Sequence, residues 1–234
     1  MAPAFPNYDL PPGEVHVWKV PLASTSAGVL PLHDLLSPPE LARAGRFSFE
    51  RDQARFISCR ASLRLILSRY LGVPPGIILF RTEPYGKPVL AHIADWQFNV
   101  SHSRDLAAIA ISRRDFVGID IELIDPGFPR DDVAPDTLAP DELASLLSLP
   151  QDQQPARFFQ YWTLKEALLK AVGSGFSLDP RALRIHIDGP EPPSILSAPP
   201  ALGGATLHQF TLHDTFASAL AVLAPVSRLS FFTL

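Results

Sequence analysis

Hydrophobic and polar positions repeat along the chain with two different periods, and the pattern therefore predicts both helices and strands. Apolar side chains recur at helical spacing over about 52–71 and 154–172, which predicts two long helices. Shorter stretches predict two brief helices, at 37–45 and 140–147. Others predict strands, at 15–20, 77–81, 96–100, 106–112, 116–124, 182–187, 206–212, 217–223 and 228–232. Because helices and strands are interspersed and short turns join many strands, we expect an α+β fold.

Composition narrows the class of protein. The 234 residues include 47% hydrophobic positions and carry a net charge of -4, which argues against a broad binder of nucleic acid. No apolar run reaches the ~18 residues that a spanning helix needs, so no membrane segment is expected. The N-terminus lacks the basic start and apolar core of a secretory signal, which favours a cytoplasmic protein. Cys59 is the single cysteine, so the chain can form no internal disulfide.

The predicted strand at 116–124 carries two carboxylates on one face. Alternation places Ile119 and Ile121 on one side and Gly118, Asp120 and Glu122 on the other. Residues two apart on a strand are about 6.5–7 Å apart, so the two carboxylates lie side by side and repel unless a cation or water screens them. Oxygen ligands of this kind suit Mg²⁺. The alternative is the solvated outer face of an antiparallel strand.

The helix at 154–172 is mostly apolar but contains three charged residues near its end. Trp162, Glu166 and Lys170 are spaced i, i+4, i+8 and so share one face, while Lys165 is the third charged residue. Glu166 and Lys170 stand in the favourable order for a structural ion pair. The functional alternative makes Glu166 a third metal ligand or a base, and the lysines partners of phosphate or carboxylate groups.

Four motifs together resemble those of one enzyme family. They are Tyr-Gly-Lys-Pro at 85–88, Phe-Asn-Val-Ser-His-Ser at 98–103, Val-Gly-Ile-Asp-Ile-Glu at 117–122, and the segment 162–175, which begins Trp-Thr-Leu-Lys-Glu-Ala and ends Gly-Ser-Gly. In this order they resemble the surfactin-type (Sfp-type) 4′-phosphopantetheinyl transferases, over roughly residues 37–175. The resemblance implies a pseudo-twofold pair of similar α/β halves, 1–114 and 115–234, with coenzyme A held between them.

The resemblance also implies roles for individual residues. It makes Asp120, Glu122 and Glu166 the ligands of Mg²⁺, and Glu166, Lys170 and Asp120 the catalytic set, with Glu166 or a water that it holds taking a proton from a serine. The implied contacts to coenzyme A come from basic and small polar residues, namely Arg43, Arg46, Lys87, Pro88, Ser101, His102, Lys165 and Lys170. One position departs from the family: Glu40 stands where members often have a basic residue for the 3′-phosphate, which leaves Arg43 as the candidate and Arg55 or Arg60 as possible substitutes.

The implied reaction transfers 4′-phosphopantetheine from coenzyme A to a serine of an apo acyl or peptidyl carrier protein, with release of 3′,5′-ADP. It would activate fatty acid, polyketide or non-ribosomal peptide synthases, and the resemblance implies a monomer. The proline-rich stretch 125–140, expected as a loop, is the candidate for contacting the carrier. Two alternatives stay open: a Mg²⁺-dependent phosphohydrolase that uses the same carboxylates, and a non-catalytic module that binds coenzyme A or a carrier.

Overall fold

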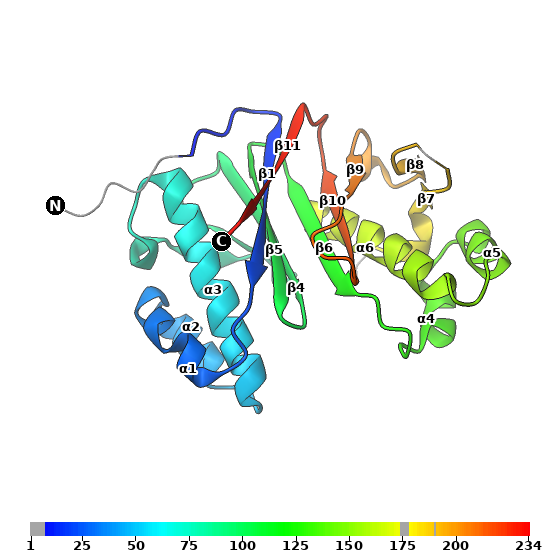
Figure 1. Ribbon diagram of the computed structural model, residues 1–234. Coiled ribbons are helices and arrows are strands. Elements are labelled where there is room, and N and C mark those ends of the chain that lie inside the picture. The colour runs from blue at the N-terminus through cyan, green and yellow to red at the C-terminus, as the bar shows by residue number, and fades with distance from the viewer. Residues whose placement is uncertain (1–7, 174–177, 190) are drawn as a thin grey trace.

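The computed structural model describes residues 8–173, 178–189 and 191–234 (Figure 1). Its helices are α1 (Ser26–Val29), α2 (Pro38–Ala44), α3 (Glu50–Leu71), α4 (Arg130–Thr137), α5 (Pro140–Ser148) and α6 (Gln154–Val172), with short 3-10 turns η1 (Leu30–Leu35), η2 (Pro75–Ile77), η4 (Pro180–Ala182) and η5 (Pro200–Leu202). Its strands are β1 (Glu14–Pro21), β2 (Phe80–Thr82), β3 (Pro88–Leu90), β4 (Trp96–Ser103), β5 (Leu106–Arg113), β6 (Val117–Leu123), β7 (Arg184–His186), β8 (Ser194–Ser197), β9 (Thr206–Gln209), β10 (Phe216–Val222) and β11 (Arg228–Thr233). The α+β class expected from the sequence is confirmed.

The first sheet has the strand order β11-β1-β5-β4, and helix α3 packs on it. The buried face of α3 presents Leu63, Ile66 and Leu67 to Trp18 and Ile109 of the sheet. Figure 1 shows α3 running along this sheet, with α1 and α2 on its outer side. Strand β11 comes from the C-terminus but pairs in parallel with β1, so the end of the chain returns to the first sheet.

The second sheet has the order β6-β10-β9, and helix α6 packs across it. Phe158, Leu164 and Leu168 of α6 are fully buried against Ala219 and Ala221 of β10. Helices α4 and α5 cover the outer side of α6 (Figure 1). The arrangement repeats that of the first half, in which one long helix lies on one sheet.

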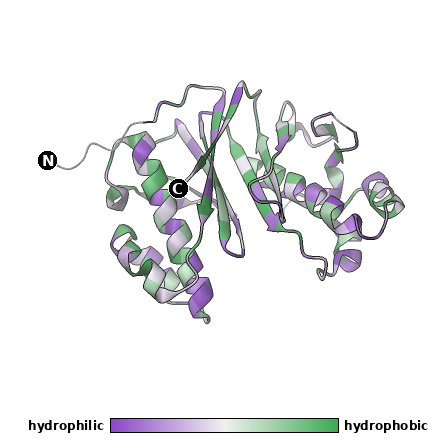
Figure 2. Ribbon diagram, in the orientation of Figure 1, coloured by the Kyte–Doolittle hydropathy of each residue, from purple (hydrophilic) through white to green (hydrophobic). Residues whose placement is uncertain are grey.

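The two sheets meet where the edge strands β4 and β6 lie side by side (Figure 1). A third apolar cluster lies between the sheets and includes Val17, Ala108, Ile119, Ile121 and Leu220, all fully buried. Figure 2 shows many hydrophobic residues in these central strands, while the outer helices carry both hydrophobic and hydrophilic residues. The joint between the two halves is therefore a packed interior, which fixes the strands that carry the candidate site.

Several local expectations need correction. The stretch 125–140 is not a continuous loop, because 130–137 forms helix α4 even though Pro135 lies inside it; the acidic residues of its first turn and the burial of Ala134 and Thr137 support the helix. His102 lies within β4 and not in a loop between strands. Helix α6 ends at Gly173, whose φ of 74° is the left-handed cap that glycine favours, and the rest of the Gly-Ser-Gly motif lies outside the described residues. No helix in the described parts of the chain is long and apolar enough to cross a bilayer.

Candidate active site

The candidate site lies where β4, β6 and α6 come together, and Gly118 permits their close approach. A Cβ atom added at Gly118 would lie 2.0 Å from the carbonyl oxygen of Ala167 and 2.4 Å from the amide nitrogen of Ala171. Only a residue without a side chain lets the backbone of α6 cross β6 at this distance. The space beside Gly118, on the face that carries Asp120 and Glu122, is therefore filled by the helix.

Asp120 is the buried centre of the site. It is only 2% exposed, and its Oδ1 accepts a hydrogen bond from Ser101 Oγ at 2.7 Å and an ion pair from Lys170 Nζ at 2.6 Å. Lys170 also donates to Ser101 Oγ at 3.1 Å. The second carboxylate oxygen, Oδ2, is buried and has no hydrogen-bond partner among the described residues. Lys170 thus pairs with Asp120 on the neighbouring strand and not with Glu166 on its own helix.

Two further carboxylates share the cavity with Asp120. Glu122 and Glu166 line a hollow of about 250 Å³ together with Asp120, Lys170 and His102. Burial raises the pKa of Glu122, and the charge of Asp120 raises it further. Burial also raises the pKa of Glu166, again with a contribution from Asp120, while Lys170 opposes the shift. Three carboxyl groups and a single ammonium group therefore lie in one small cavity, where the negative charges repel one another.

The donor set fits a divalent cation in its chemistry. Mg²⁺ prefers carboxylate oxygens, and the unpartnered Oδ2 of Asp120 is an acceptor that a cation would satisfy. As the side chains stand, however, no group of three acidic, histidine or cysteine side chains in the described residues converges closely enough to enclose a metal ion. The ion pair from Lys170 occupies Oδ1 of Asp120 in this arrangement. The three acidic residues are therefore candidates for a metal site that forms when the Lys170 side chain moves away from Asp120.

A second cavity, of about 240 Å³, adjoins the first and shares Val100, Glu166 and Lys170 with it. Lys87 and Pro88 line this cavity, as expected from the sequence. Lys87 Nζ donates to the carbonyl oxygen of Lys170 at 2.7 Å and so stabilises the C-terminal end of α6, where the helix dipole favours a cation. Burial lowers the pKa of Lys87 to about 8.

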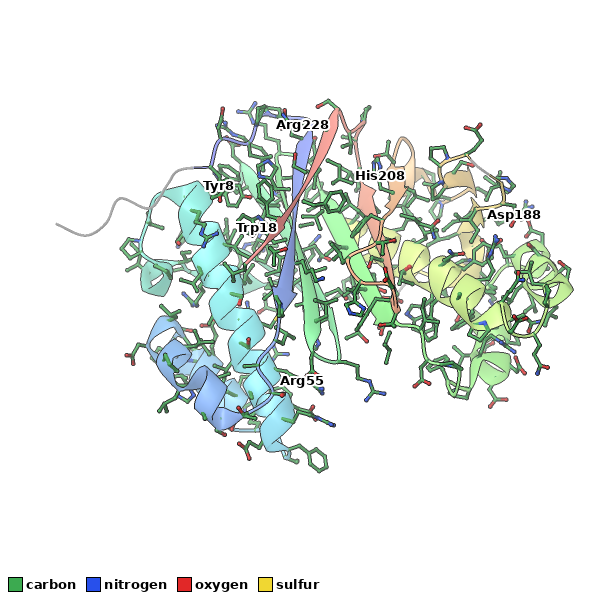
Figure 3. All side chains as sticks on the ribbon, viewed as in Figure 1. Tyr8, Trp18, Arg55, Asp188, His208 and Arg228 are labelled. Atoms are coloured by element: carbon green, nitrogen blue, oxygen red, sulfur yellow. The ribbon has the colours of Figure 1, made fainter. Side chains whose placement is uncertain are left out.

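Ser101 and His102 are both brought to the site from β4. They point to opposite sides of the strand, so Ser101 reaches Asp120 while His102 lines the rim of the same cavity. Burial lowers the pKa of His102, and the nearby charges of Lys170 and Arg55 lower it further. Arg55 lies near the N-terminal end of α3, at the lower end of this helix in Figure 3.

Lys165 was predicted to contact the cofactor, and the structure places it elsewhere. Its side chain is 1% exposed and turns away from the cavity to pair with Glu142 of α5 at 2.6 Å. It also donates to the carbonyl oxygens of Pro180 and Leu183, at 2.9 and 2.7 Å. Consecutive helical residues lie about 100° apart, so Lys165 cannot share the face of Glu166. Its role is structural, since it joins α6 to α5 and to the start of β7.

Arg43 of α2 and Arg46, just after this helix, are likewise not brought to the carboxylates. Arg43 lies over the ring of Phe56 at 5.2 Å, and both Arg43 and Arg46 are exposed and line neither cavity. Glu40 accepts a hydrogen bond from the backbone nitrogen of Ser37 at 2.8 Å and pairs with Arg64 at 2.8 Å. The acidic residue at this position is thus a helix cap and a partner of α3.

Two residues that the sequence did not single out also belong to the site. Asn99 and Ser103 lie two positions before and two positions after Ser101 on β4, and both contact the backbone of β6. Asn99 also lines the cavity of about 240 Å³. The signal available in the sequence was the recurrence of polar side chains at 97, 99, 101 and 103, every second position of the strand.

Comparison with known proteins gives matches in both halves of the chain. A model described as the 4'-phosphopantetheinyl transferase superfamily matches residues 116–221, and one described as 4'-phosphopantetheinyl transferase, N-terminal, matches residues 23–114. The 4'-phosphopantetheinyl transferase HetI of Nostoc is 40% identical over 200 residues, which span 84% of each chain. The chain belongs to the 4′-phosphopantetheinyl transferase family.

Other members of the family extend the comparison, and the resemblance inferred from the four motifs is confirmed. The 4'-phosphopantetheinyl transferase Sfp of Bacillus subtilis is 31% identical over 156 residues, covering 66% of this chain and 68% of Sfp. The crystal structure of holo-[acyl-carrier-protein] synthase from Thermotoga maritima aligns with a TM-score of 0.40 and 24% identity, over 47% of this chain and 64% of that one. As a member of this family, the protein is a phosphopantetheinyl transferase enzyme.

Proposed function

We propose that this enzyme transfers 4′-phosphopantetheine from coenzyme A to a serine hydroxyl of an apo acyl or peptidyl carrier protein. The reaction would require Mg²⁺, release 3′,5′-ADP and activate a fatty acid, polyketide or non-ribosomal peptide synthase. Besides family membership, one observation carries the proposal: Asp120, Glu122 and Glu166 line one cavity with Lys170, and Asp120 keeps a buried oxygen without a partner.

Asp120, Glu122 and Glu166 are the residues that would hold Mg²⁺. When bound, the ion would supply positive charge to the oxygens of a pyrophosphate and lower the energy of the transition state. The buried carboxylates would also repel one another less, because the charge that raises the pKa of Glu122 and of Glu166 would be balanced. The Lys170 ammonium would then be available for a phosphate oxygen and would no longer be held by Asp120.

We assign proton transfer to Glu166. Its carboxylate lines the cavity beside Lys170, where it or a water that it holds can accept a proton from a hydroxyl group bound there. The serine oxygen of the carrier forms a bond to the β-phosphorus of coenzyme A while the bond from that phosphorus to the bridging oxygen breaks. The serine proton passes to Glu166, and the leaving oxygen departs on 3′,5′-ADP.

We place the nucleotide end of coenzyme A in the cavity of about 240 Å³ beside Lys87 and Pro88. This cavity shares Lys170 with the carboxylate site, so a ligand lying in it can present its pyrophosphate to Asp120 and Glu166. Ser101 and His102 line the carboxylate cavity and would contact the phosphates. The contacts of Arg43 and Arg46 with the 3′-phosphate stay predictions.

We place the carrier protein on the opposite side of the carboxylates. A hollow of about 190 Å³ shares Glu122 and Trp162 with the carboxylate site. It shares Phe128 and Phe159 with a larger hollow, of about 1080 Å³, along the segment 124–132. These adjoining hollows support the assignment of the 125–140 segment to carrier contact.

Exchanging the 125–140 segment for that of a relative with another carrier preference should change the carrier preference. An unchanged preference would remove the segment from the docking surface.

The division into halves 1–114 and 115–234 and the monomeric state belong to the same proposal. The repeated pairing of one helix with one sheet supports two halves, although β11 crosses the boundary to join the first sheet. Light scattering at working concentration tests the monomer, and a mass of two chains would contradict it.

Consumption of coenzyme A separates the proposal from its two rivals. The purified protein is incubated with coenzyme A and Mg²⁺, with and without an apo carrier, and 3′,5′-ADP is measured by chromatography. A transferase releases 3′,5′-ADP only when the carrier is present. Release without the carrier indicates a phosphohydrolase, and binding without release in either tube indicates a binding module.

A further inference from the structure

The two edge strands at the centre of the molecule, β4 and β6, belong to different sheets. The first sheet ends at β4 and the second ends at β6, and in the described residues no main-chain ladder joins the two. An edge strand leaves a row of N–H groups that need partners. Side chains of β4 supply partners at two of these positions on β6.

The two partners flank the carboxylates. Asn99 Oδ1 accepts a hydrogen bond from the amide of Ile119 at 2.9 Å. Ser103 Oγ accepts one from the amide of Leu123 at 3.2 Å. These amides lie immediately before Asp120 and immediately after Glu122.

The acceptor roles follow from chemistry. A backbone amide is a donor only, so the carboxamide of Asn99 must turn its oxygen toward Ile119. Asn99 is 6% exposed, so its bond to Ile119 lies in a dry environment where leaving either partner without a hydrogen bond is costly. Between the two acceptors, Ser101 donates to Asp120 itself. The segment from 119 to 123 is therefore fixed to β4 at both ends and in the middle.

We propose that Asn99 and Ser103 are positioning residues of the transfer reaction, which hold β6 in register so that Asp120 and Glu122 face Lys170 and Glu166. This inference rests on the proposed function. Strands paired through a ladder keep their register through many bonds, whereas in the described residues β6 is joined to β4 by side-chain bonds and by no ladder. A displacement of about 1 Å at a reacting centre costs on the order of 10²-fold in rate.

The test compares variants that lose an acceptor with variants that keep it. Asn99→Leu and Ser103→Ala each remove one acceptor, whereas Ser103→Thr keeps the hydroxyl. Thr206→Val is the matched control, because Thr206 lies on β9, outside the two site strands, and the change removes the hydrogen bond from its Oγ1 to the carbonyl oxygen of Ala224. Melting temperature, kcat at saturating substrates and KM for the carrier are measured for each variant.

We expect kcat to fall at least tenfold in Asn99→Leu and in Ser103→Ala, with KM for the carrier unchanged. Ser103→Thr should recover most of the rate, and Thr206→Val should keep the wild-type kcat despite a lower melting temperature. If the acceptor variants lose stability but keep kcat, the bonds only stabilise the fold and the proposal is wrong. The proposal is also wrong if Thr206→Val loses as much activity as Asn99→Leu and Ser103→Ala.

Amide hydrogen exchange followed by NMR gives a readout that does not depend on activity. In the free enzyme, the Ile119 amide should exchange faster in Asn99→Leu, and the Leu123 amide faster in Ser103→Ala, each without an effect on the other. Unchanged exchange in both variants would overturn the positioning role, even if wild-type transfer is observed. If wild-type enzyme transfers nothing while the exchange behaves as expected, the proposed function fails and the attachment of β6 to β4 stands.

Discussion

Replacing Gly118 with alanine should separate helix α6 from strand β6 and so take the site apart. The new Cβ would meet the carbonyl oxygen of Ala167 at 2.0 Å, where real contacts essentially never fall below 3.0 Å. The helix must therefore retreat by about 1 Å, since backbone and not a flexible side chain is in the way. A retreat directly away from β6 would open the Lys170–Asp120 pair from 2.6 Å to about 3.6 Å, beyond a hydrogen bond.

Two measurements follow from this displacement. Overpacking of a close-packed interior costs about 1–3 kcal/mol, which urea denaturation should detect. Misplacement of Glu166 and Lys170 by about 1 Å should lower the transfer rate on the order of 10²-fold. Gly76→Ala is the control, because a Cβ added there meets nothing within 4 Å. If Gly118→Ala matches Gly76→Ala in both stability and rate, the close approach of α6 does not hold the site together.

Four further outcomes can be measured directly. Lys165→Met should destabilise the protein by about 3–5 kcal/mol in urea denaturation, because it leaves the buried Glu142 carboxylate unpaired, and adding Glu142→Gln should recover part of this loss. Lys170→Ala should raise KM for coenzyme A by about 10–100-fold, the loss of one charge-assisted bond, and change KM for the carrier much less. Burial raises the pKa of the Cys59 thiol to about 11, so a thiol reagent at pH 7.5 should label it only after unfolding, and rapid labelling of the native protein would contradict its burial. Burial lowers the pKa of His16 below its ordinary 6.5, so the unfolded chain binds the proton more readily, and stability should fall as pH drops below about 6.5; His16→Asn should flatten that part of the pH profile.

The sequence predicted those parts of the site that depend on local spacing. Alternation on β6 placed Asp120 and Glu122 on one face, and helical spacing placed Glu166 and Lys170 on one face of α6. Both placements agree with the residues that line the cavity. The two long helices were predicted close to their observed bounds, because each has an apolar stripe long enough to outweigh local exceptions.

Other features depend on contacts that sequence distance conceals. The partner of Lys165 is Glu142, on a different helix, and no local rule connects the two. The bonds from Asn99 and Ser103 to β6 depend on two edge strands of separate sheets lying together. The close approach of α6 to β6 at Gly118 likewise depends on a contact between segments far apart in the sequence. By contrast, the Ser37–Glu40 cap followed a local pattern that was available in the sequence.

His16 lies in a buried cluster of aromatic side chains that includes Trp18 and Tyr70. Tyr70 OH accepts a hydrogen bond from Trp18 Nε1 at 2.8 Å and forms a second hydrogen bond with His16 Nδ1, also at 2.8 Å. Figure 3 shows Trp18 and Tyr8 together in this part of the first half, and the Tyr8 ring lies 5.5 Å from that of Trp18. Burial among these rings lowers the pKa of His16, because it removes water from the charged imidazolium, and the charge of Arg228 lowers the pKa further.

The most direct test of the central claim is the intact mass of a carrier protein after incubation with the enzyme, coenzyme A and Mg²⁺. The account predicts a gain of one phosphopantetheine per carrier, which disappears when the acceptor serine is replaced, when Mg²⁺ is chelated, or when Glu166 is changed to glutamine. An unchanged carrier mass across fatty acid, polyketide and peptide carriers would contradict the proposed reaction. A full gain with Glu166→Gln would contradict the role assigned to that carboxylate.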